Sequence, residues 1–255
     1  MIKRAWRKLR NVTLRPWLGT ITHVATQENV VALTFDDGPN PEVTPRLLEI
    51  LDRHGAKATF FVIGESAQEQ PQLLRQMAEA GHAIGNHTWD HISLPLVPSQ
   101  ERQDQIRACK EAIAPYGQTL FRPPFGHLDL AARFDLFRLG YQVITWNLMG
   151  IDWLDHDADR LVARLTQEIR PGSIILLHDR LYQFSERRFA DRTPTLEAVD
   201  TVLQQLAGDY RFVTVPELLQ YGKPVRRIWT RKADVTWLNE LQDADGRSPR
   251  QYSPA

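Results

Sequence analysis

The stretch VVALTFDDGP, residues 30–39, is an apolar run that ends in two adjacent carboxylates and a Gly-Pro turn. A run of this kind, rich in β-branched residues, is typical of a strand buried on both faces of a parallel sheet. Enzymes built on such sheets place their chemistry in the loops that follow the carboxyl ends of the strands. We therefore expect a buried strand over residues 30–35, with Asp36 and Asp37 at its functional end.

Six further apolar runs follow, and helical patterns separate them. The runs are ATFFVI (58–63), HAIGN (82–86), TLFR (119–122), YQVITW (141–146), SIILL (173–177) and YRFVTV (210–215). The helical patterns cover residues 41–55, 66–81, 99–117, 128–139, 157–170 and 194–207. A repeated strand–helix unit gives a parallel sheet, either open or closed into a barrel. Because no glycine-rich phosphate loop follows the first strand, we expect an α/β barrel with fewer than eight strands.

The composition excludes several classes of protein. The 255 residues include 31 Lys and Arg against 31 Asp and Glu, so no strongly basic domain marks a nucleic-acid-binding protein. The single cysteine can form neither an internal disulfide nor a cysteine-rich zinc site, so histidines and carboxylates have to hold any metal. No run approaches the roughly 18 consecutive apolar residues of a membrane-spanning helix, so we expect no transmembrane span.

Both ends of the chain differ from a central domain that we place at residues 30–222. Residues 1–29 form a basic N-terminal arm with six Lys and Arg. Arg10 and Arg15 interrupt the apolar stretch that a secretory signal requires, so the sequence predicts a cytoplasmic protein. The arm is either a solvated basic segment or an amphipathic segment that contacts an anionic membrane surface. Residues 223–255 form a C-terminal extension whose end we expect to be disordered.

Ionisable side chains follow five of the seven predicted strands. These side chains are Asp36 and Asp37, His87 and His91, Arg122, Asp152, and His178 with Asp179. Each has a purely structural explanation when taken alone, since adjacent acids start turns and a histidine pair can lie on the surface. Five such groups at the carboxyl ends of one barrel would meet at its mouth. We therefore predict a single site that contains them all.

These blocks resemble the polysaccharide deacetylase family, also called the NodB-homology domain or carbohydrate esterase family 4. The matching blocks, in the order of the family, are TFDDGP (34–39), NHTWDH (86–91), RPPFG (122–126), DW (152–153) and LLHD (176–179). The resemblance covers about residues 30–215 and implies a distorted (β/α)7 barrel with parallel strands, similar to a TIM barrel. It also implies an acetylated glycan as the substrate, which neither composition nor strand count indicates.

The resemblance further implies a metal site. Asp37, His87 and His91 resemble the ligands of one divalent metal ion, usually Zn²⁺. One carboxylate and two imidazoles leave coordination positions open, as a catalytic rather than a structural site requires. We therefore expect a metal-dependent enzyme.

The remaining block residues resemble an acid–base pair with its supports. Asp36 resembles the general base that takes a proton from the nucleophilic water, and Arg122 resembles the residue that keeps Asp36 ionised and oriented. His178 resembles the general acid that protonates the leaving amine, and Asp152 resembles the carboxylate that tunes it. The backbone N–H of Phe125 resembles an oxyanion donor.

One block departs from the family pattern, and the substrate stays open. The family commonly has Asp-x-x-Asp-Trp, whereas Met149 stands at the first acidic position here. This departure concerns the local loop and its substrate contacts rather than the metal ligands. The leading interpretation is a hydrolase that removes N-acetyl groups from amino sugars of a chitin-like or peptidoglycan-like glycan. The alternatives are a deacetylase of O-acetyl esters or small amides, and an inactive barrel that binds glycans.

Overall fold

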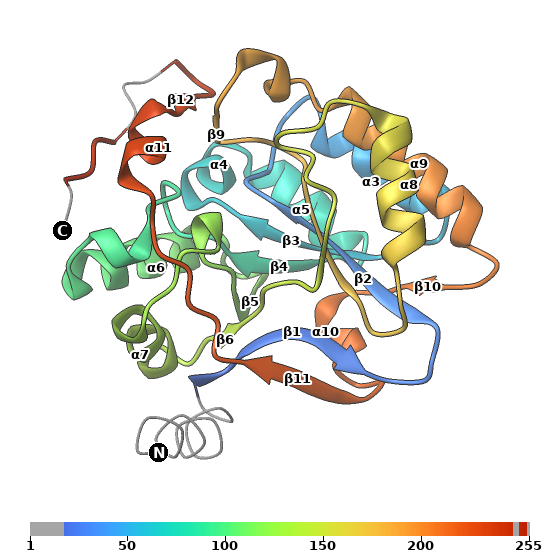
Figure 1. Cartoon of the computed structure of the whole chain (residues 1–255), viewed down its shortest axis with the longest axis horizontal. Helices are drawn as coiled ribbons and strands as arrows, with labels where there is room; N and C mark the ends of the chain where they lie inside the picture. Colours follow the sequence, from blue (N-terminus) through green and yellow to red (C-terminus); the bar gives the residue numbers. More distant parts are fainter. Residues whose placement is uncertain (1–17, 247–249, 254–255) are drawn as a thin grey trace, which may run out of the picture.

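The computed structural model describes residues 18–246 and 250–253 of the chain (Figure 1). Most of the basic arm, residues 1–17, lies outside the described residues, so its contact with a membrane and the cytoplasmic location stay predictions. Within the part that is described, no helix combines the length and the apolar character needed to cross a bilayer.

The centre of the fold is a parallel sheet with the strand order β6-β5-β4-β3-β2-β8-β7, and β10 pairs with β2 beside this path. The strands are β2 (Val30–Asp36), β3 (Ala58–Val62), β4 (Ala83–Asn86), β5 (Gly117–Phe121), β6 (Gln142–Val143), β7 (Leu148–Met149), β8 (Ile174–His178) and β10 (Arg211–Phe212). The sheet curves into a half-barrel with helices outside it, and this confirms the predicted distorted (β/α)7 barrel.

Two of the predicted strands are shorter than their apolar runs. The run 141–146 is a strand only at Gln142–Val143, and the chain re-enters the sheet as β7, which the sequence did not indicate. Between the two strands, the side chain of Asn147 accepts a hydrogen bond from the N–H of Ile174 at 2.9 Å and so replaces a ladder bond. The run 210–215 likewise gives only a two-residue strand.

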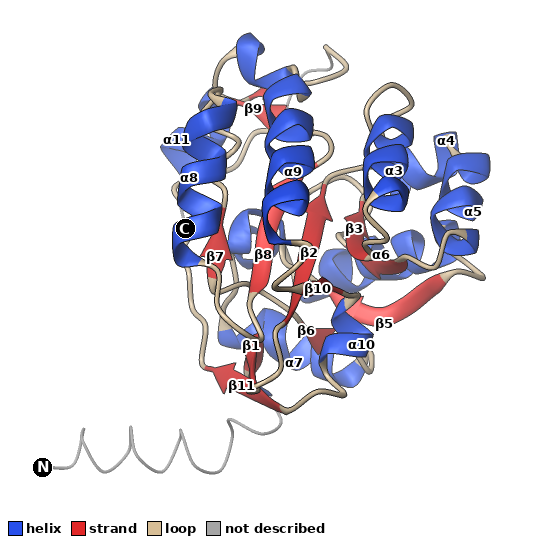
Figure 2. Cartoon of the chain, turned by 90° about the vertical axis from the view of Figure 1, so that its right-hand side faces the viewer, coloured by secondary structure: helices blue, strands red, loops and turns tan. Residues whose placement is uncertain are grey.

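The described residues form several α-helices, most of which cover the outer face of the sheet. They are α3 (Thr44–Arg53), α4 (Gly64–Glu69), α5 (Pro71–Glu79), α6 (Ser99–Ala112), α7 (Leu130–Arg138), α8 (Ala158–Glu168), α9 (Thr193–Leu206), α10 (Val215–Leu218) and α11 (Val235–Glu240), with 3₁₀ turns at Leu94–Leu96, Pro124–Gly126 and Arg187–Ala190. Figure 2 shows α3, α9 and α8 side by side in one layer over β2 and β8. The single helix predicted over residues 66–81 is broken into α4 and α5, because Pro71 has no N–H to continue the first helix.

The core explains why the central strands are apolar throughout. Every residue of β2 and of β3 is buried. On the outer face, Phe60 and Leu33 pack in one cluster with Leu47 and Leu51 of α3 and with Val202 of α9. The rigid sheet that results holds the carboxyl ends of its strands in fixed positions.

The two ends of the chain are joined to the barrel and to each other. The strand β1 (Thr20–Ala25) pairs antiparallel with β11 (Lys223–Arg227), so the sequence boundaries at residues 30 and 222 each leave one strand of this pair outside the central domain. Farther along, β12 (Gln242–Asp243) pairs antiparallel with β9 (Gln183–Phe184). In Figure 1, α11 and β12 lie beside β9 at the end of the barrel where the carboxyl ends of the strands meet. Residues 223–246 of the C-terminal extension therefore form part of that end, and the expected disorder of the last residues stays a prediction, since residues 247–249 and 254–255 lie outside the described residues.

Candidate active site

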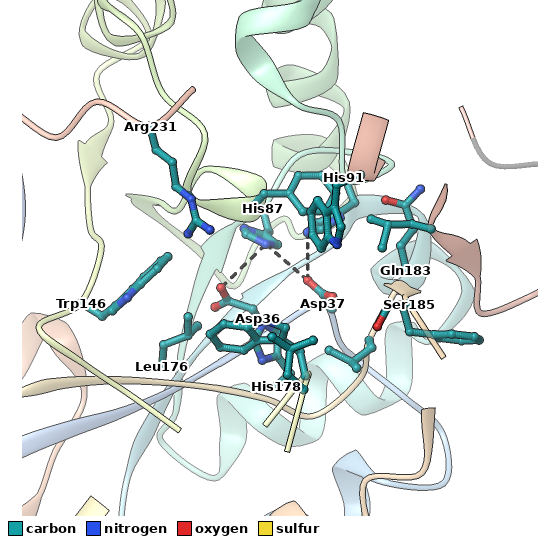
Figure 3. A pocket seen from close by; sticks show the side chains of 18 residues that line it. Asp36, Asp37, His87, His91, Trp146, Leu176, His178, Gln183, Ser185 and Arg231 are labelled. Atoms are coloured by element: carbon teal, nitrogen blue, oxygen red, sulfur yellow. Dashed lines mark ion pairs between the residues drawn. The ribbon is translucent and has the colours of Figure 1, made fainter. Parts of the chain in front are cut away.

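A pocket opens at the carboxyl ends of the central strands (Figure 3). Six of the eight predicted site residues line it, namely Asp36, Asp37, His87, His91, Phe125 and, from β8, His178. Arg122 and Asp152 are fully buried behind the pocket, where each contacts one of these residues. The structure thus places all eight predicted residues in or directly behind one site.

The adjacent carboxylates face different partners because the backbone turns between them. Asp36 is the last residue of β2, whereas Asp37 has a positive φ of 73°. Asp37 uses Oδ2 to accept the N–H of Tyr182 at 2.9 Å, which leaves Oδ1 facing the two histidines. Asp36 instead accepts a hydrogen bond from Arg122.

Three side chains could hold a metal ion. One ligand atom from each of Asp37, His87 and His91 lies within 4.8 Å of the others. Asp37 Oδ1 is 3.4 Å from Nε2 of His87 and 3.3 Å from Nε2 of His91. The orientation of His87 is fixed by its Nδ1–H, which donates to the carbonyl of Arg122 at 2.7 Å.

One oxygen of this cluster lacks a hydrogen-bond partner, as expected of an atom that binds a cation. Asp37 Oδ1 is buried and has no hydrogen-bond partner among the described residues. A buried polar atom left unpaired costs about 1–3 kcal/mol, and a cation coordinated by Oδ1 removes that cost. The residues present therefore fit a divalent ion.

The protonation states also fit a cation. Burial alone raises the pKa of Asp37, but the imidazoles of His91, His87 and His178 together outweigh burial and hold this pKa well below its usual range. Burial lowers the pKa of His91 to about 4, so that its ring is neutral at pH 7. An ionised carboxylate and a neutral imidazole are the forms in which these side chains bind metals.

Arg122 is a buried support for Asp36. Its Nη1 donates to Oδ1 of Asp36 at 2.7 Å and to Oγ1 of Thr34 at 2.7 Å. Its Nη2 donates to the carbonyl of Thr145 at 3.1 Å, and its guanidinium lies 4.1 Å from the ring centroid of Phe61. Because each side of the guanidinium is held, Arg122 fixes the carboxylate of Asp36 in one orientation.

The opposite side of the pocket carries a second buried network. The Nδ1–H of His178 donates to Oδ1 of Asp152 at 2.9 Å, and the backbone N–H of His178 donates to Oδ2 of the same carboxylate at 2.9 Å. Burial by itself lowers the pKa of His178, but the carboxylates of Asp152, Asp37 and Asp36 together raise it more, and the net shift of the pKa is upward. With Nδ1 engaged by Asp152, Nε2 is the ring nitrogen left to act on a bound molecule.

Arg192 completes this network, and sequence analysis missed it. Its guanidinium forms a buried ion pair with Oδ2 of Asp152, and its Nη1 donates to the backbone carbonyl of Asp152 at 2.9 Å. In the sequence, Arg192 lies among several arginines of the segment SERRFADRTP, and no local pattern separates it from the exposed Arg187 and Arg188. Only the tertiary path brings it under His178.

Phe125 has the backbone geometry of a donor site. Its φ is 57°, which is unusual for a residue with a side chain, and its N–H has no hydrogen-bond acceptor among the described residues. Its ring centroid lies 4.3 Å from that of His91 and 5.8 Å from that of Trp237. The ring contacts thus hold a strained turn beside the metal-site histidine.

The first and the last motif, TFDDGP (34–39) and LLHD (176–179), pack against each other at Gly38 and Asp179. A Cβ atom added to Gly38 would lie 2.3 Å from Oδ2 of Asp179, so no other residue fits there. That carboxyl accepts a hydrogen bond from Oγ1 of Thr44 at 2.5 Å, and burial raises its pKa to about 7. Gly38 and Asp179 therefore support the site by packing. Met149, by contrast, lies on β7 with 38% of its surface exposed and does not line the pocket.

Comparison with known proteins agrees with the motifs and with the fold. The family model described as polysaccharide deacetylase matches residues 23–144. A peptidoglycan-N-acetylglucosamine deacetylase of Bacillus cereus is 35% identical over 203 residues, which cover 78% of this chain and 92% of the relative. A chitooligosaccharide deacetylase of Azorhizobium caulinodans is 39% identical over 166 residues, 64% of this chain and 79% of the relative. The crystal structure of the Bc1960 peptidoglycan N-acetylglucosamine deacetylase has a TM-score of 0.72 at 31% identity, over 80% of this chain and 94% of that one.

Proposed function

The chain belongs to the polysaccharide deacetylase family and is a glycan deacetylase, and from this premise we propose that it hydrolyses the N-acetyl groups of amino sugars with a divalent metal held by Asp37, His87 and His91. The observation that carries the proposal is the buried, unpartnered Oδ1 of Asp37 between two imidazole nitrogens. Two nitrogen ligands and one oxygen ligand suit Zn²⁺, so we propose zinc as the metal.

A metal ion bound there would polarise the acetyl carbonyl and make water a stronger nucleophile. Asp36, whose Oδ1 accepts a hydrogen bond from Arg122 at 2.7 Å, is the base that accepts a proton from the attacking water. The N–H of Phe125, which has no acceptor in the described part of the chain, donates to the oxygen that becomes negative.

His178 completes the reaction as the acid. Its Nε2–H protonates the amine of the sugar as the C–N bond breaks, because an unprotonated amine is a poor leaving group. The carboxylate of Asp152 favours the protonated form of His178 and orients its ring, and Arg192 keeps that carboxylate ionised. The raised pKa of His178 favours the protonated form that a general acid requires.

Aromatic side chains in the pocket support a sugar as the substrate. Trp146, Trp153 and Trp237 all line it, and their flat faces suit stacking on sugar rings. Among the relatives, one is named for peptidoglycan N-acetylglucosamine and one for chitooligosaccharide. We propose N-acetylglucosamine-containing oligosaccharides or polysaccharides as the substrate class.

Acetate release from a panel of acetylated compounds tests this function. The panel contains chitotetraose, peptidoglycan fragments, an O-acetylated xylan and a small N-acetyl amide, each with the protein as purified, after chelation, and after readdition of Zn²⁺. We expect release from the two amino-sugar glycans that stops on chelation and returns with Zn²⁺. Release from the xylan or the small amide alone would favour the alternative substrates, and no release from any compound would favour an inactive glycan-binding barrel.

A further inference from the structure

We propose that Arg231 in the C-terminal extension binds an anionic group of the glycan, a carboxylate or a phosphate, and so makes the enzyme prefer acidic glycans. Arg231 belongs to a C-terminal wall of the pocket, which we define as the lining residues Arg231, Trp237 and Leu241 together with Trp229, which packs on the lining residue Trp146. The inference rests on the proposed function and specifies its substrate.

The C-terminal wall is anchored at its first half. Nε1 of Trp229 donates to the carbonyl of Gly126 at 2.9 Å, and its ring packs edge-on against Trp146 with centroids 5.2 Å apart. Two residues later, Leu128 and Arg231 exchange backbone hydrogen bonds of 3.2 and 3.3 Å. Since Leu128 is buried and follows the Phe125 turn closely, the backbone of Arg231 has a fixed position relative to the site.

The second half of the wall is anchored as well. The side chain of Asp234 caps α11 by accepting the N–H of Trp237 at 3.2 Å, and the ring of Trp237 packs against Phe125. After Leu241, the chain pairs with β9 and donates from the N–H of Ala244 to the carbonyl of Tyr182 at 3.0 Å. The extension therefore contacts both sides of the pocket through hydrogen bonds and ring packing.

Arg231 is the cation of this pocket that has no partner in the protein. Among the described residues that line the pocket it is the one arginine or lysine. Its side chain is exposed and has neither an ion pair nor a hydrogen bond within the described part of the chain. Figure 3 shows its guanidinium end pointing into the pocket, on the side of Trp146 and His87. Burial and the charge of Arg231 together lower the pKa of the nearby His127 to about 4.

The acidic residues of the pocket do not neutralise this charge. Asp36 is bound by Arg122, and Asp37 faces the two histidines. The lining on the side of Arg231 includes the aromatic ring of Trp146 (Figure 3). A guanidinium in such surroundings binds carboxylate and phosphate groups with two parallel hydrogen bonds, whereas a neutral hydroxyl gains much less from it.

Kinetics on matched oligosaccharides test the inference. The substrates are acetylated oligosaccharides of equal length: an all-N-acetylglucosamine chain, one carrying lactyl ether carboxylates, its neutral carboxamide, and one carrying a phosphate. The wild type is compared with Arg231→Gln, with Arg231→Lys, and with Arg46→Gln, which removes an exposed arginine on α3 away from the pocket. The carboxylate and phosphate arms identify which anion the site accepts.

We expect Arg231→Gln to raise KM for at least one anionic substrate about tenfold while kcat changes little. KM for the neutral chain and for the carboxamide should stay within about twofold, and Arg231→Lys should recover part of the loss because it restores the charge without the planar fork. Arg46→Gln should match the wild type on all substrates. Equal changes in KM for charged and neutral substrates, or no change in either, would overturn the inference.

A binding measurement keeps this test separate from that of the proposed function. In the His178→Ala background, the Kd of the anionic oligosaccharide should rise about tenfold on Arg231→Gln, and the Kd of the neutral chain should not. If the wild type releases acetate in a metal-dependent way but Arg231→Gln shows no selectivity in either measurement, the inference fails and the proposed function stands. If no substrate releases acetate, the proposed function fails, and the inference fails with it.

Discussion

The metal side of the pocket, Asp37 with His87 and His91, and the acid side, His178 with Asp152 and Arg192, differ in how their polar atoms are paired. On the metal side, Asp37 Oδ1 and His91 Nδ1 are buried without a hydrogen-bond partner among the described residues. On the acid side, both oxygens of Asp152 accept hydrogen bonds, and Nδ1 of His178 donates one. The described residues thus pair the carboxylate of the acid side, whereas they leave two buried polar atoms of the metal side unpaired.

The two sides also show how histidine can serve either as a metal ligand or as an acid. His91 and His178 are both shielded from water, yet the pKa of His91 falls to about 4 and that of His178 rises. Burial lowers both values, but only His178 donates directly to a carboxylate that is itself held by an arginine. A histidine has to be neutral to bind a metal, and it has to be protonated to act as an acid, so each side has the electrostatics its proposed role requires.

Removal of a histidine from the metal side should have the largest effect. We expect His87→Ala to lose the metal and to reduce acetate release at least about a thousandfold, because two protein ligands hold a metal poorly and the metal supplies several kcal/mol of transition-state stabilisation. Metal analysis after gel filtration and an acetate assay check this, with His156→Ala, outside the pocket, as the control. A variant that keeps one equivalent of metal would exclude His87 as a ligand.

Removal of the acid should reduce the rate without disturbing the metal. We expect His178→Ala to lower kcat about 10²–10⁴-fold, the usual contribution of a general acid, at unchanged metal content. Metal analysis after gel filtration and the acetate assay check this prediction. Near-full activity in this variant, or loss of the metal, would contradict the separation between the two sides.

A change within the acid side should move the pH dependence of the reaction. His178 acts in its protonated form, so activity falls as the pH rises through its pKa, and Asp152 displaces that pKa upward. We expect Asp152→Asn to shift the alkaline limb of kcat/KM to lower pH by at least about one unit. Asp155→Asn, which removes a carboxylate paired with Arg160 at the surface, is the control and should leave the limb in place. An unmoved limb in Asp152→Asn would mean that His178 does not set it.

Much of this fold was predictable because the sequence marks it locally. Every predicted strand overlaps one observed strand, since long apolar runs are needed wherever both faces of the sheet are covered. The two-residue strand β7 has no such run, and the pairing of β1 with β11 joins segments about two hundred residues apart that no local pattern connects. Local sequence patterns therefore did not predict the strand pairs that join distant segments.

In the candidate site, too, local patterns predicted some residues but not those that depend on non-local contacts. Asp36, His87 and His178 were identified because each directly follows a predicted strand, and parallel strands bring such positions to one edge. Arg192 and Trp237 reach the site through loops and a terminal helix, so their proximity depends on the complete tertiary path. The roles assigned to the motif residues stay predictions until the variants are measured.

The smallest effect is expected at the position that departs from the family pattern. Met149 is exposed and outside the pocket, on the strand that precedes Asp152. We expect Met149→Asp to change kcat/KM by no more than about twofold, since surface substitutions away from a site are nearly neutral. A gain or loss above tenfold in steady-state kinetics would show that this loop contacts the substrate.

The adjacent acids Asp36 and Asp37 test most directly the claim that the site has a metal side and a proton-transfer side. Metal content and acetate release are measured in parallel for Asp36→Asn and Asp37→Asn. Asp36 is bound by Arg122 and Asp37 faces His87 and His91, so we expect Asp36→Asn to keep one equivalent of metal while its rate falls at least about a hundredfold. Asp37→Asn should lose both metal and activity. Loss of the metal from Asp36→Asn, or its retention by Asp37→Asn, would contradict the assignment of the two carboxylates.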